Sequence, residues 1–281
     1  METPAGKIRQ AQREAWDKSS TGWKKWDAVT MQFLKPTADE MIHMLQIRSG
    51  FRMLDIATGT GEPGLSMASL IPDGKVTGTD LSAEMLAVAM ENARSRGITN
   101  FETLSCEESG LPLEDDSMDA ISCRFGCMFF PEIRIGLEEM FRVLKPGRRL
   151  ALSVWNGPEK NPWVTNSMET MIALLGLNPP APGAPGMFRC ARQGEMAEIL
   201  SDLGFQHIEQ KEVRGELRFD TPEAYWNFIS EVASPVAFSK ADTMLQNEIR
   251  ELVIRKALKK CPDGNIALGS SAWVISGEKP R

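Results

Sequence analysis

Histidine is scarce in this chain of 281 residues, which contains only His43 and His207. His43 lies in a stretch that we expect to be helical, and His207 precedes a predicted strand, away from the glycine-rich motif described below. Histidine is the most common general base in enzymes that work near neutral pH. We therefore predict that neither histidine is a catalyst.

Cysteine is present in an odd number and without any C-x-x-C spacing. The five cysteines are Cys106, Cys123, Cys127, Cys190 and Cys261. Disulfide frameworks and structural zinc sites both need paired, closely spaced cysteines. The sequence thus predicts reduced thiols in a cytoplasmic protein, and no metal.

Basic clusters and long apolar runs are also missing. The formal charge is −6 and no block of lysine or arginine stands out, so we expect no nucleic-acid partner. No apolar run approaches the roughly 20 residues that cross a bilayer, and the polar N-terminus does not resemble a secretory signal. A monomer and a homodimer both remain open.

The first fifty residues have apolar residues at helical spacing and predict a helical cap over 1–50. We expect a break near "SSTG" (19–22). A further helix is predicted to begin with Thr37 as its cap and to stop at Gly50.

Strands and helices then alternate. Predicted strands cover 51–57, 75–80, 100–105, the end of 114–123, and 149–155. Predicted helices cover 63–71, 82–97 with Ser82 as cap and Gly97 as stop, and 132–149 ending at Pro146-Gly147. Such a β-α-β rhythm is typical of a parallel sheet with helices on both faces.

Beyond Trp155 the pattern is looser. It predicts a helix over 195–205, a strand within 206–219, helices over 221–233 and 240–261, and a final strand over 271–280. We find no second core, and predict one domain over 1–281. Its parts are the cap (1–50), an α/β core (51–216), a helical insertion (217–264) and the last strand (265–281).

The stretch "MLDIATGTGEPGLSM" (53–67) follows the first predicted strand with Gly59, Gly61 and Gly64 in G-x-G-x-x-G spacing. Glycines at a strand end allow a ligand to approach the backbone closely. Asp80, at the end of the second strand, lies where ribose hydroxyls need a carboxylate. Both features suit NAD and S-adenosylmethionine equally.

The acids of this stretch favour S-adenosylmethionine. Asp55 and Glu62 would repel a pyrophosphate, and Pro63 removes an N–H from the helix start that should hold phosphate. S-adenosylmethionine has no phosphate and carries an ammonium and a sulfonium. An NAD-dependent oxidoreductase is therefore the weaker alternative.

Four segments in order resemble motifs of class I S-adenosylmethionine-dependent methyltransferases, closest to the ubiquinone/menaquinone-biosynthesis-like branch. They are "LDIATGTGEPG", "GTDLSAEMLAVA", "LPLEDDSMDAISCRFGCMFF" and "EEMFRVLKPGRRLALSVW". The resemblance implies an α/β fold with a Rossmann-like, mostly parallel seven-stranded sheet, an N-terminal helical cap and a C-terminal helical insertion.

The resemblance also implies cofactor contacts. Asp55, Ala57, Gly59 and Gly61 would line the methionine part, and Asp80 would bind the ribose. Leu81 and Met85 would flank the adenine, with Glu107 or Glu108 near its amino group. Arg124 would lie beside the methionine part, mainly through its backbone, although its guanidinium could instead meet an acidic substrate.

Tryptophan and phenylalanine supply a candidate surface for a flat acceptor. The candidates are Trp23, Trp26, Phe129, Trp155, Asn161 and Trp163, which are also consistent with plain packing. We predict a methyltransferase that modifies oxygen or carbon of an aromatic or quinone-like small molecule. A non-catalytic protein that only binds S-adenosylmethionine is a further alternative.

Overall fold

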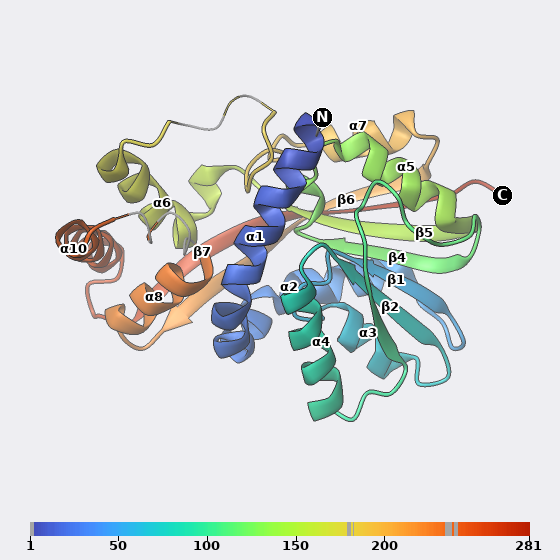
Figure 1. Cartoon of the computed structure of the whole chain (residues 1–281), viewed down its shortest axis with the longest axis horizontal. Coiled ribbons are helices and arrows are strands. Elements are labelled where there is room, and N and C mark those ends of the chain that lie inside the picture. The colour runs from blue at the N-terminus through green and yellow to red at the C-terminus, as the bar shows by residue number, and fades with distance from the viewer. Residues whose placement is uncertain (1–2, 179–180, 182, 234–237, 239–240) are drawn as a thin grey trace.

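The computed structural model describes residues 3–178, 181, 183–233, 238 and 241–281. Its centre is one seven-stranded sheet with the order β3-β2-β1-β4-β5-β7-β6 (Figure 1). The strands are β1 (Arg52–Ile56), β2 (Lys75–Asp80), β3 (Phe101–Ser105), β4 (Met118–Arg124), β5 (Leu144–Trp155), β6 (Gln206–Phe219) and β7 (Ile266–Glu278). The prediction of a seven-stranded α/β sheet is confirmed.

Strands β1 to β5 pair in parallel, and β7 is inserted antiparallel between β5 and β6. The parallel part brings the carboxyl ends of β1, β2, β4 and β5 to one edge. The order reverses between β1 and β4, and open α/β sheets bind their ligands at such a switch point.

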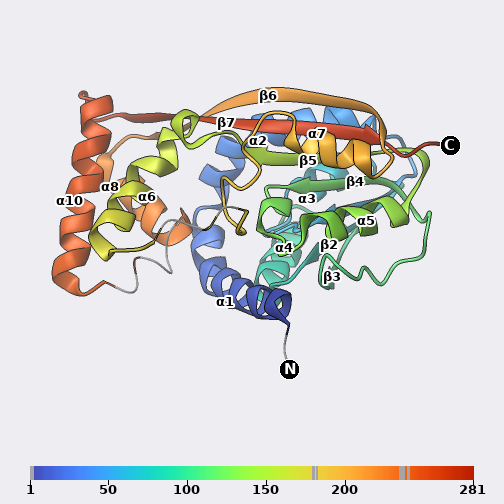
Figure 2. The same ribbon diagram turned by 90° about the horizontal axis from the view of Figure 1, so that it is seen from above.

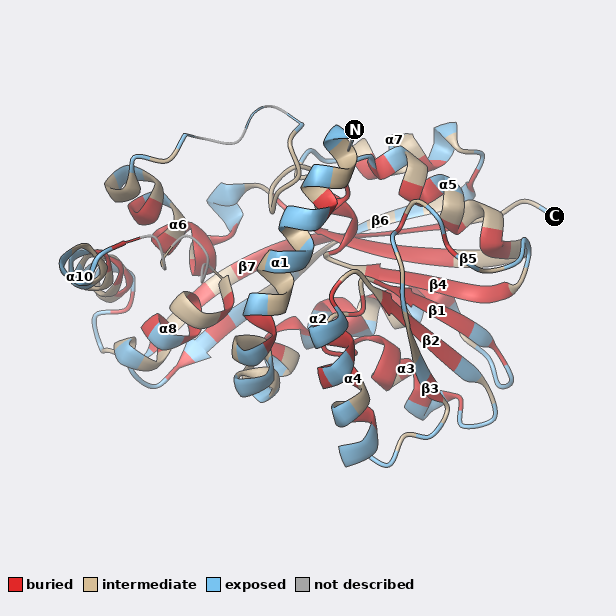
Figure 3. Cartoon of the chain, in the orientation of Figure 1, coloured by how far each residue is buried: buried red, intermediate tan, exposed pale blue. Residues whose placement is uncertain are grey.

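Helices cover both faces of the sheet (Figures 1 and 2). One face packs against α2 (Asp27–Leu45), α3 (Gly64–Leu70) and α4 (Ala83–Ser95), and the other against α5 (Ile133–Val143) and α7 (Glu195–Asp202). Figure 3 shows the resulting burial of the central strands, whereas β6 at the edge alternates with exposed residues. The apolar parallel strands are thus shielded from water, as their sequences require.

Helix α1 (Pro4–Lys25) runs across the carboxyl edge of the sheet (Figures 1 and 2). The remaining helices lie near the end of β6 and the start of β7. They are α6 (Pro162–Leu175), α8 (Pro222–Phe228), the π-helical η3 (Ile229–Ala233) and α10 (Thr243–Lys260). Short 3-10 turns are η1 (Cys127–Phe129) and η2 (Pro158–Lys160). The chain division predicted above stays a prediction, and its boundary at residue 216 falls within β6.

Two expectations for the N-terminal helices are wrong. The helix continues without a break through residues 19–22. The hydroxyls of Ser19 and Ser20 donate to the backbone carbonyls of Ala15 and Asp17 in the same helix. The chain bends at Trp26 instead. Likewise Thr37 lies inside α2, which begins at Asp27 and ends at Leu45 rather than at Gly50.

Further elements differ from the predicted ones, among them β7, which begins at Ile266 rather than at residue 271. Helix α5 ends at Val143, and β5 begins at Leu144 rather than at residue 149 because Leu144 already pairs with Met118 of β4, before an irregular stretch that leads to Arg149. Helix α6 was not anticipated, since its side chains are buried on most sides and show little amphipathic periodicity. The predicted start of the last helix at residue 240 lies outside the described residues, and α10 begins at Thr243.

The helix over 82–97 is confirmed as α4. Ser82 Oγ accepts a hydrogen bond from the Met85 backbone N–H at 3.1 Å, and Gly97 follows with a φ of +67°. Within the described residues, no helix combines the length and the apolarity that a membrane crossing requires.

Candidate active site

One cavity of about 480 Å³ lies at the carboxyl ends of β1, β2, β4 and β5. Its lining begins with the glycine-rich loop after β1 and continues past the ends of β2 and β4 to aromatic residues of β5 and α6. Residues of α1, η3 and the segment around Met187 complete the wall. A cofactor and an acceptor can therefore share one enclosure.

The glycine loop is fixed from below by β2. Asp80 Oδ2 accepts the Gly59 N–H at 2.9 Å, and the Thr58 N–H donates to the Thr79 carbonyl at 2.9 Å. Gly59 and Gly61 have φ values of +56° and +112°, a region that favours glycine. A Cβ on Gly59 would meet no atom within 4 Å, so the loop leaves open space above it.

Asp55 lies behind this loop and does not line the cavity. Its buried carboxylate accepts hydrogen bonds from Thr58 Oγ1 at 2.6 Å, the Gly64 N–H at 3.1 Å and Ser122 Oγ at 2.5 Å. Burial raises its pKa to about 6, against the opposing effect of these donors. Its position supports the loop and does not agree with a direct cofactor contact.

Glu62 lines the cavity, yet its carboxylate is already paired. Oε1 accepts from Arg96, and Oε2 accepts the Ser66 N–H at 3.2 Å at the start of α3. Arg96 also lies 3.4 Å from Asp27 Oδ2. The two acids that the sequence presents at the loop are thus largely occupied by the protein itself.

The end of β2 and the loop after β3 form the other side of the cofactor region. Leu81 and Met85 line the cavity, as does Asp80, whose Oδ1 accepts the Ser82 N–H at 2.9 Å. Glu108 also lines it, and its Oε1 accepts Arg9 Nη2 at 2.8 Å and Nε at 3.0 Å. Glu107 does not line the cavity and is about half exposed, near Arg9 and Arg13.

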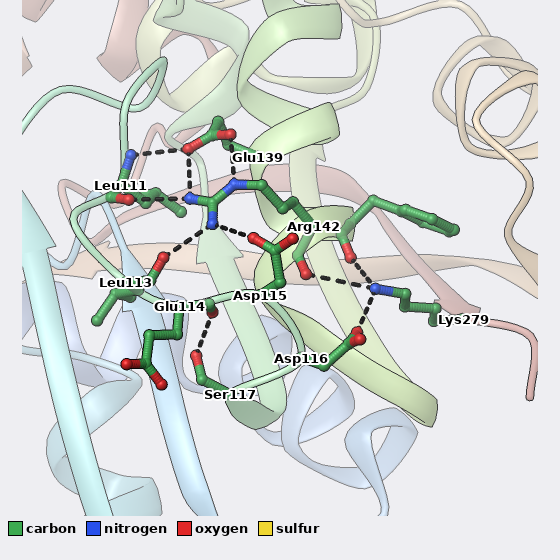
Figure 4. A network of polar contacts seen from close by, with 10 residues as sticks. Leu111, Leu113, Glu114, Asp115, Asp116, Ser117, Glu139, Arg142 and Lys279 are labelled. Atoms are coloured by element: carbon green, nitrogen blue, oxygen red, sulfur yellow. Dashed lines mark hydrogen bonds and ion pairs between the residues drawn. The ribbon is translucent and has the colours of Figure 1, made fainter.

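A network around Arg142 of α5 holds the loop that follows Glu108 (Figure 4). The Arg142 guanidinium donates to the carbonyls of Leu111 and Leu113 at 2.9 and 2.8 Å and to the carboxylates of Glu139 and Asp115. Lys279 Nζ binds Asp116 and the last carbonyls of α5 nearby. This loop is therefore anchored at several points, which fixes where Glu108 stands.

Arg124, at the end of β4, lines the cavity and has neither a hydrogen bond nor an ion pair to any described residue through its guanidinium. Desolvation lowers its pKa, while the charges of Glu62, Asp55 and Asp27 act in the opposite direction. Arg124 is half-buried in the cavity wall, and the partial burial of a guanidinium without a partner is unfavourable unless a ligand supplies one.

The acceptor side of the cavity is aromatic. Phe125 stacks on Trp155 with centroids 4.0 Å apart and planes 11° apart, and Trp163 lies 5.2 Å from Trp155. Phe129 and Trp23 line the cavity too, each in edge contact with Trp16. The Trp23 indole N–H is buried without a hydrogen-bond partner among the described residues, so a ligand oxygen would satisfy it.

Two residues predicted to contact the acceptor do not line the cavity. Trp26 donates to Glu231 Oε2 at 2.8 Å and packs on Phe219 and Phe228. Asn161 is fully buried, where its amide holds Ser271 and its Oδ1 accepts Trp163 Nε1 at 3.2 Å. Asn161 thus orients a wall residue, and Trp26 joins α1 and α2 to the C-terminal helices.

Several wall residues were missed from the sequence. They are Gln12, Phe33, Met168, Met187, Phe228 and Val232. None belongs to a motif: Gln12, Phe33, Phe228 and Val232 lie outside the predicted core of 51–216, and Met168 and Met187 lie in the part of it that follows the last motif. Arg9 was also missed, because its partner Glu108 is 99 residues away and no local pattern connects the two residues.

The residues present fit S-adenosylmethionine. Each oxygen of Asp80 accepts one N–H and keeps a lone pair that ribose hydroxyls can use. Glu108 Oε2 has no hydrogen bond within the described residues and suits an adenine amino group. Leu81 and Met85 would supply apolar contacts to the adenine, and the open space over Gly59 would leave room for the methionine part.

Comparisons with known proteins agree with this picture. Residues 24–162 match the model of the ubiE/COQ5 methyltransferase family. A demethylmenaquinone methyltransferase of Porphyromonas gingivalis is 38% identical over 124 residues, 43% of this chain and 51% of that protein. One from Listeria welshimeri is 34% identical over 185 residues, 60% of this chain and 76% of that protein.

Among solved structures, the YcgJ protein of Bacillus subtilis superposes with a TM-score of 0.59 at 21% identity, covering 87% of this chain and 98% of YcgJ. Identity at that level supports the fold alone. The sequence match to the P. gingivalis protein spans about half of that protein's length.

Proposed function

Because this chain belongs to the ubiE/COQ5 methyltransferase family, we propose that it methylates a planar, apolar small molecule with an aromatic or quinone-like ring, on oxygen or carbon. S-adenosylmethionine is the methyl donor of the family, and S-adenosylhomocysteine is the product. An NAD-dependent oxidoreductase and a non-catalytic binding protein are not favoured by this membership.

The observation that carries the proposal is the continuity of the cavity. A single enclosure of about 480 Å³ joins the loop at Gly59 to the stacked Phe125–Trp155 pair. Aromatic rings prefer offset stacking or edge contacts with other rings, which Trp155, Trp163 and Phe129 offer. The names of the P. gingivalis and L. welshimeri relatives point to a quinone, which has such a ring.

The chemistry requires alignment more than acid–base catalysis. When bound, S-adenosylmethionine supplies an electrophilic methyl group, whose carbon accepts an electron pair from the acceptor while the carbon–sulfur pair stays on sulfur. The chain's part is to hold the acceptor in line and to keep water out. Such alignment is worth roughly 7–11 kcal/mol in well-oriented reactions.

The lining matches this division of work. The glycine loop and Asp80 would hold the donor, and Phe125, Trp155 and Trp163 would hold a flat ring against it. Among the described lining residues there is no histidine. An acceptor that is already ionised, or that carries an activated carbon, needs no strong base.

Incubation with methyl-labelled S-adenosylmethionine and a panel of hydroquinones, naphthols, simple phenols, amines and keto acids tests the proposal. We expect label in the naphthol or hydroquinone fractions and little in the amines. Transfer confined to amines or aliphatic acids would contradict a planar acceptor. Binding of S-adenosylhomocysteine without transfer to any member would instead favour the non-catalytic alternative.

We further infer a monomer or homodimer in the cytoplasm, without a nucleic-acid partner and without a metal. The net charge of −6 and five unpaired cysteines support this inference. Light scattering of the purified protein would test the oligomeric state, and repeating it with added polynucleotide would test for nucleic-acid binding. Adding a chelator to the activity assay would test for a metal.

A further inference from the structure

The charged side chains that line the cavity differ in whether other described residues supply their hydrogen-bond partners. Of the described lining residues, Glu62, Asp80 and Glu108 carry negative charge and Arg124 carries positive charge. Each of the three acids accepts hydrogen bonds from protein donors. The guanidinium of Arg124 alone has no partner in the described part of the chain.

The carboxylates near Arg124 are held by other donors. Arg96, from the end of α4, engages Glu62 after β1 and Asp27 of α2, while Ser122, Thr58 and Gly64 surround Asp55. These acids face Arg124 closely enough to favour its charged form, but none touches it. The cation therefore keeps all its N–H donors for a ligand.

The position of Arg124 is intermediate between the two halves of the cavity. The cavity that Arg124 lines is bounded by the glycine loop at Gly59 and also by Phe125, the residue after Arg124, which stacks on Trp155. The Phe125 backbone N–H is fixed by the Ser153 carbonyl at 3.0 Å, so the end of β4 is rigid. A ring bound against this aromatic pair lies in the same cavity as the guanidinium.

We propose that Arg124 is the anion-binding residue of the cavity, and that the anion is the ionised oxygen of the acceptor. This inference rests on the proposed function and narrows its substrate class to planar enols, phenols and hydroquinones that bind as oxyanions. The carboxylate of S-adenosylmethionine is an oxyanion too, so the experiment must separate the two sources. A guanidinium binds such oxygens through charge-assisted hydrogen bonds.

An anionic acceptor explains how the cavity works without a base. The proton leaves the acceptor to solvent before or during binding, and the guanidinium stabilises the resulting charge. The oxygen, or the ring carbon conjugated with it, then donates its electron pair to the methyl carbon. In methylation at carbon, the ring regains its aromaticity when the proton of that carbon is lost to solvent.

The first test measures binding, which needs no turnover. With the site saturated by S-adenosylhomocysteine, calorimetry compares 2-hydroxy-1,4-naphthoquinone, which is ionised at neutral pH, with the neutral 2-methoxy compound of similar shape. We expect the intact protein to prefer the anion at least tenfold. Arg124→Met should abolish the preference, Arg124→Lys should retain part of it, and Arg94→Met, at an exposed arginine of α4, should retain all of it.

The outcomes separate the two oxyanions. If Arg124→Met still prefers the anionic naphthoquinone to the neutral one, the proposal is wrong. If Arg124→Met keeps that preference and also binds S-adenosylhomocysteine ten times more weakly, the guanidinium binds the cofactor instead. If transfer to a naphthol is found, Arg124→Met should lower kcat/KM about 100-fold at pH 7 and move the acidic limb of its pH profile upward. Failure of transfer in the intact protein counts against the proposed function and leaves the binding result standing.

Discussion

Ser122 Oγ donates a hydrogen bond to Asp55 Oδ1 across 2.5 Å, beneath the glycine loop. The two residues are register partners on the parallel strands β4 and β1. The other oxygen of Asp55 accepts from Thr58 and Gly64, at the two ends of the loop. One buried carboxylate thus joins two strands and both ends of the loop that faces the ligands.

The pH dependence of stability should report on Asp55. Its pKa rises from 3.8 in the unfolded chain to about 6 in the folded protein, so the folded state holds the proton more tightly. The resulting stabilisation is complete below about pH 4 and is lost as the pH rises through 6, by about 3 kcal/mol in all. Urea unfolding at intervals from pH 4 to 7.5 measures it.

Asp55→Asn removes this titration and is the matched comparison. The difference in unfolding free energy between the natural protein and Asp55→Asn should shrink or reverse as the pH rises from 4 to 7. Parallel curves for the two proteins across that range would contradict the assignment.

Arg142→Met should release the loop that carries Glu108. It removes five hydrogen bonds to backbone and carboxylate groups, and we expect a loss of about 2–3 kcal/mol. Hydrogen exchange should accelerate at residues 106–117 above all. Arg134→Met is the control, because Arg134 is an exposed arginine of the same helix with only loose ion pairs. Equal effects of both variants would argue against a specific role for the network.

Gly22→Ala should loosen helix α1. An added Cβ would overlap the carbonyl oxygen of Glu231, so α1 must shift away from η3. Alanine is otherwise the better helix former, which makes any destabilisation informative. We expect a loss of about 2 kcal/mol and a fall in Tm of roughly 4–8 °C. Thr21→Ala, at an exposed neighbour in the same helix, should change little, and a Gly22→Ala protein with unaltered Tm would refute the contact.

Trp155→Leu should weaken acceptor binding and spare the cofactor. Loss of stacking on Phe125 should raise the acceptor KM about tenfold, with S-adenosylhomocysteine affinity unchanged within twofold. Steady-state kinetics and calorimetry measure the two quantities. Trp226→Leu, a buried tryptophan outside the cavity, controls for general loss of packing. A KM that rises equally in both variants would speak against a ring-binding role.

The sequence was informative where local chemistry decides the structure. Alternating strands and helices, the cap at Ser82 and the glycines after β1 predicted the sheet and its ligand-binding edge. The sequence favoured S-adenosylmethionine over NAD because Asp55 and Glu62 were expected to repel a pyrophosphate. The structure gives this electrostatic argument little support. Asp55 points away from the cavity and Glu62 is paired with Arg96, so neither acid is freely presented to a ligand.

What the sequence left out depends on contacts between distant segments. The pairing of Arg9 with Glu108 spans 99 residues and has no local signal. Helix α6 is buried on most sides, so its apolar pattern lacks the periodicity that identifies surface helices. The bend at Trp26 follows from docking on Glu231 and Phe228, which the order of residues around it does not reveal.

The link between Trp26 and Glu231 joins positions 205 residues apart. On the ribosome, the strands whose ends line the cavity emerge before the segment that contains Glu231. The carboxyl edge of β1, β2, β4 and β5 is therefore complete in sequence early, whereas the part of the cavity wall at η3 is added only in the last third of synthesis.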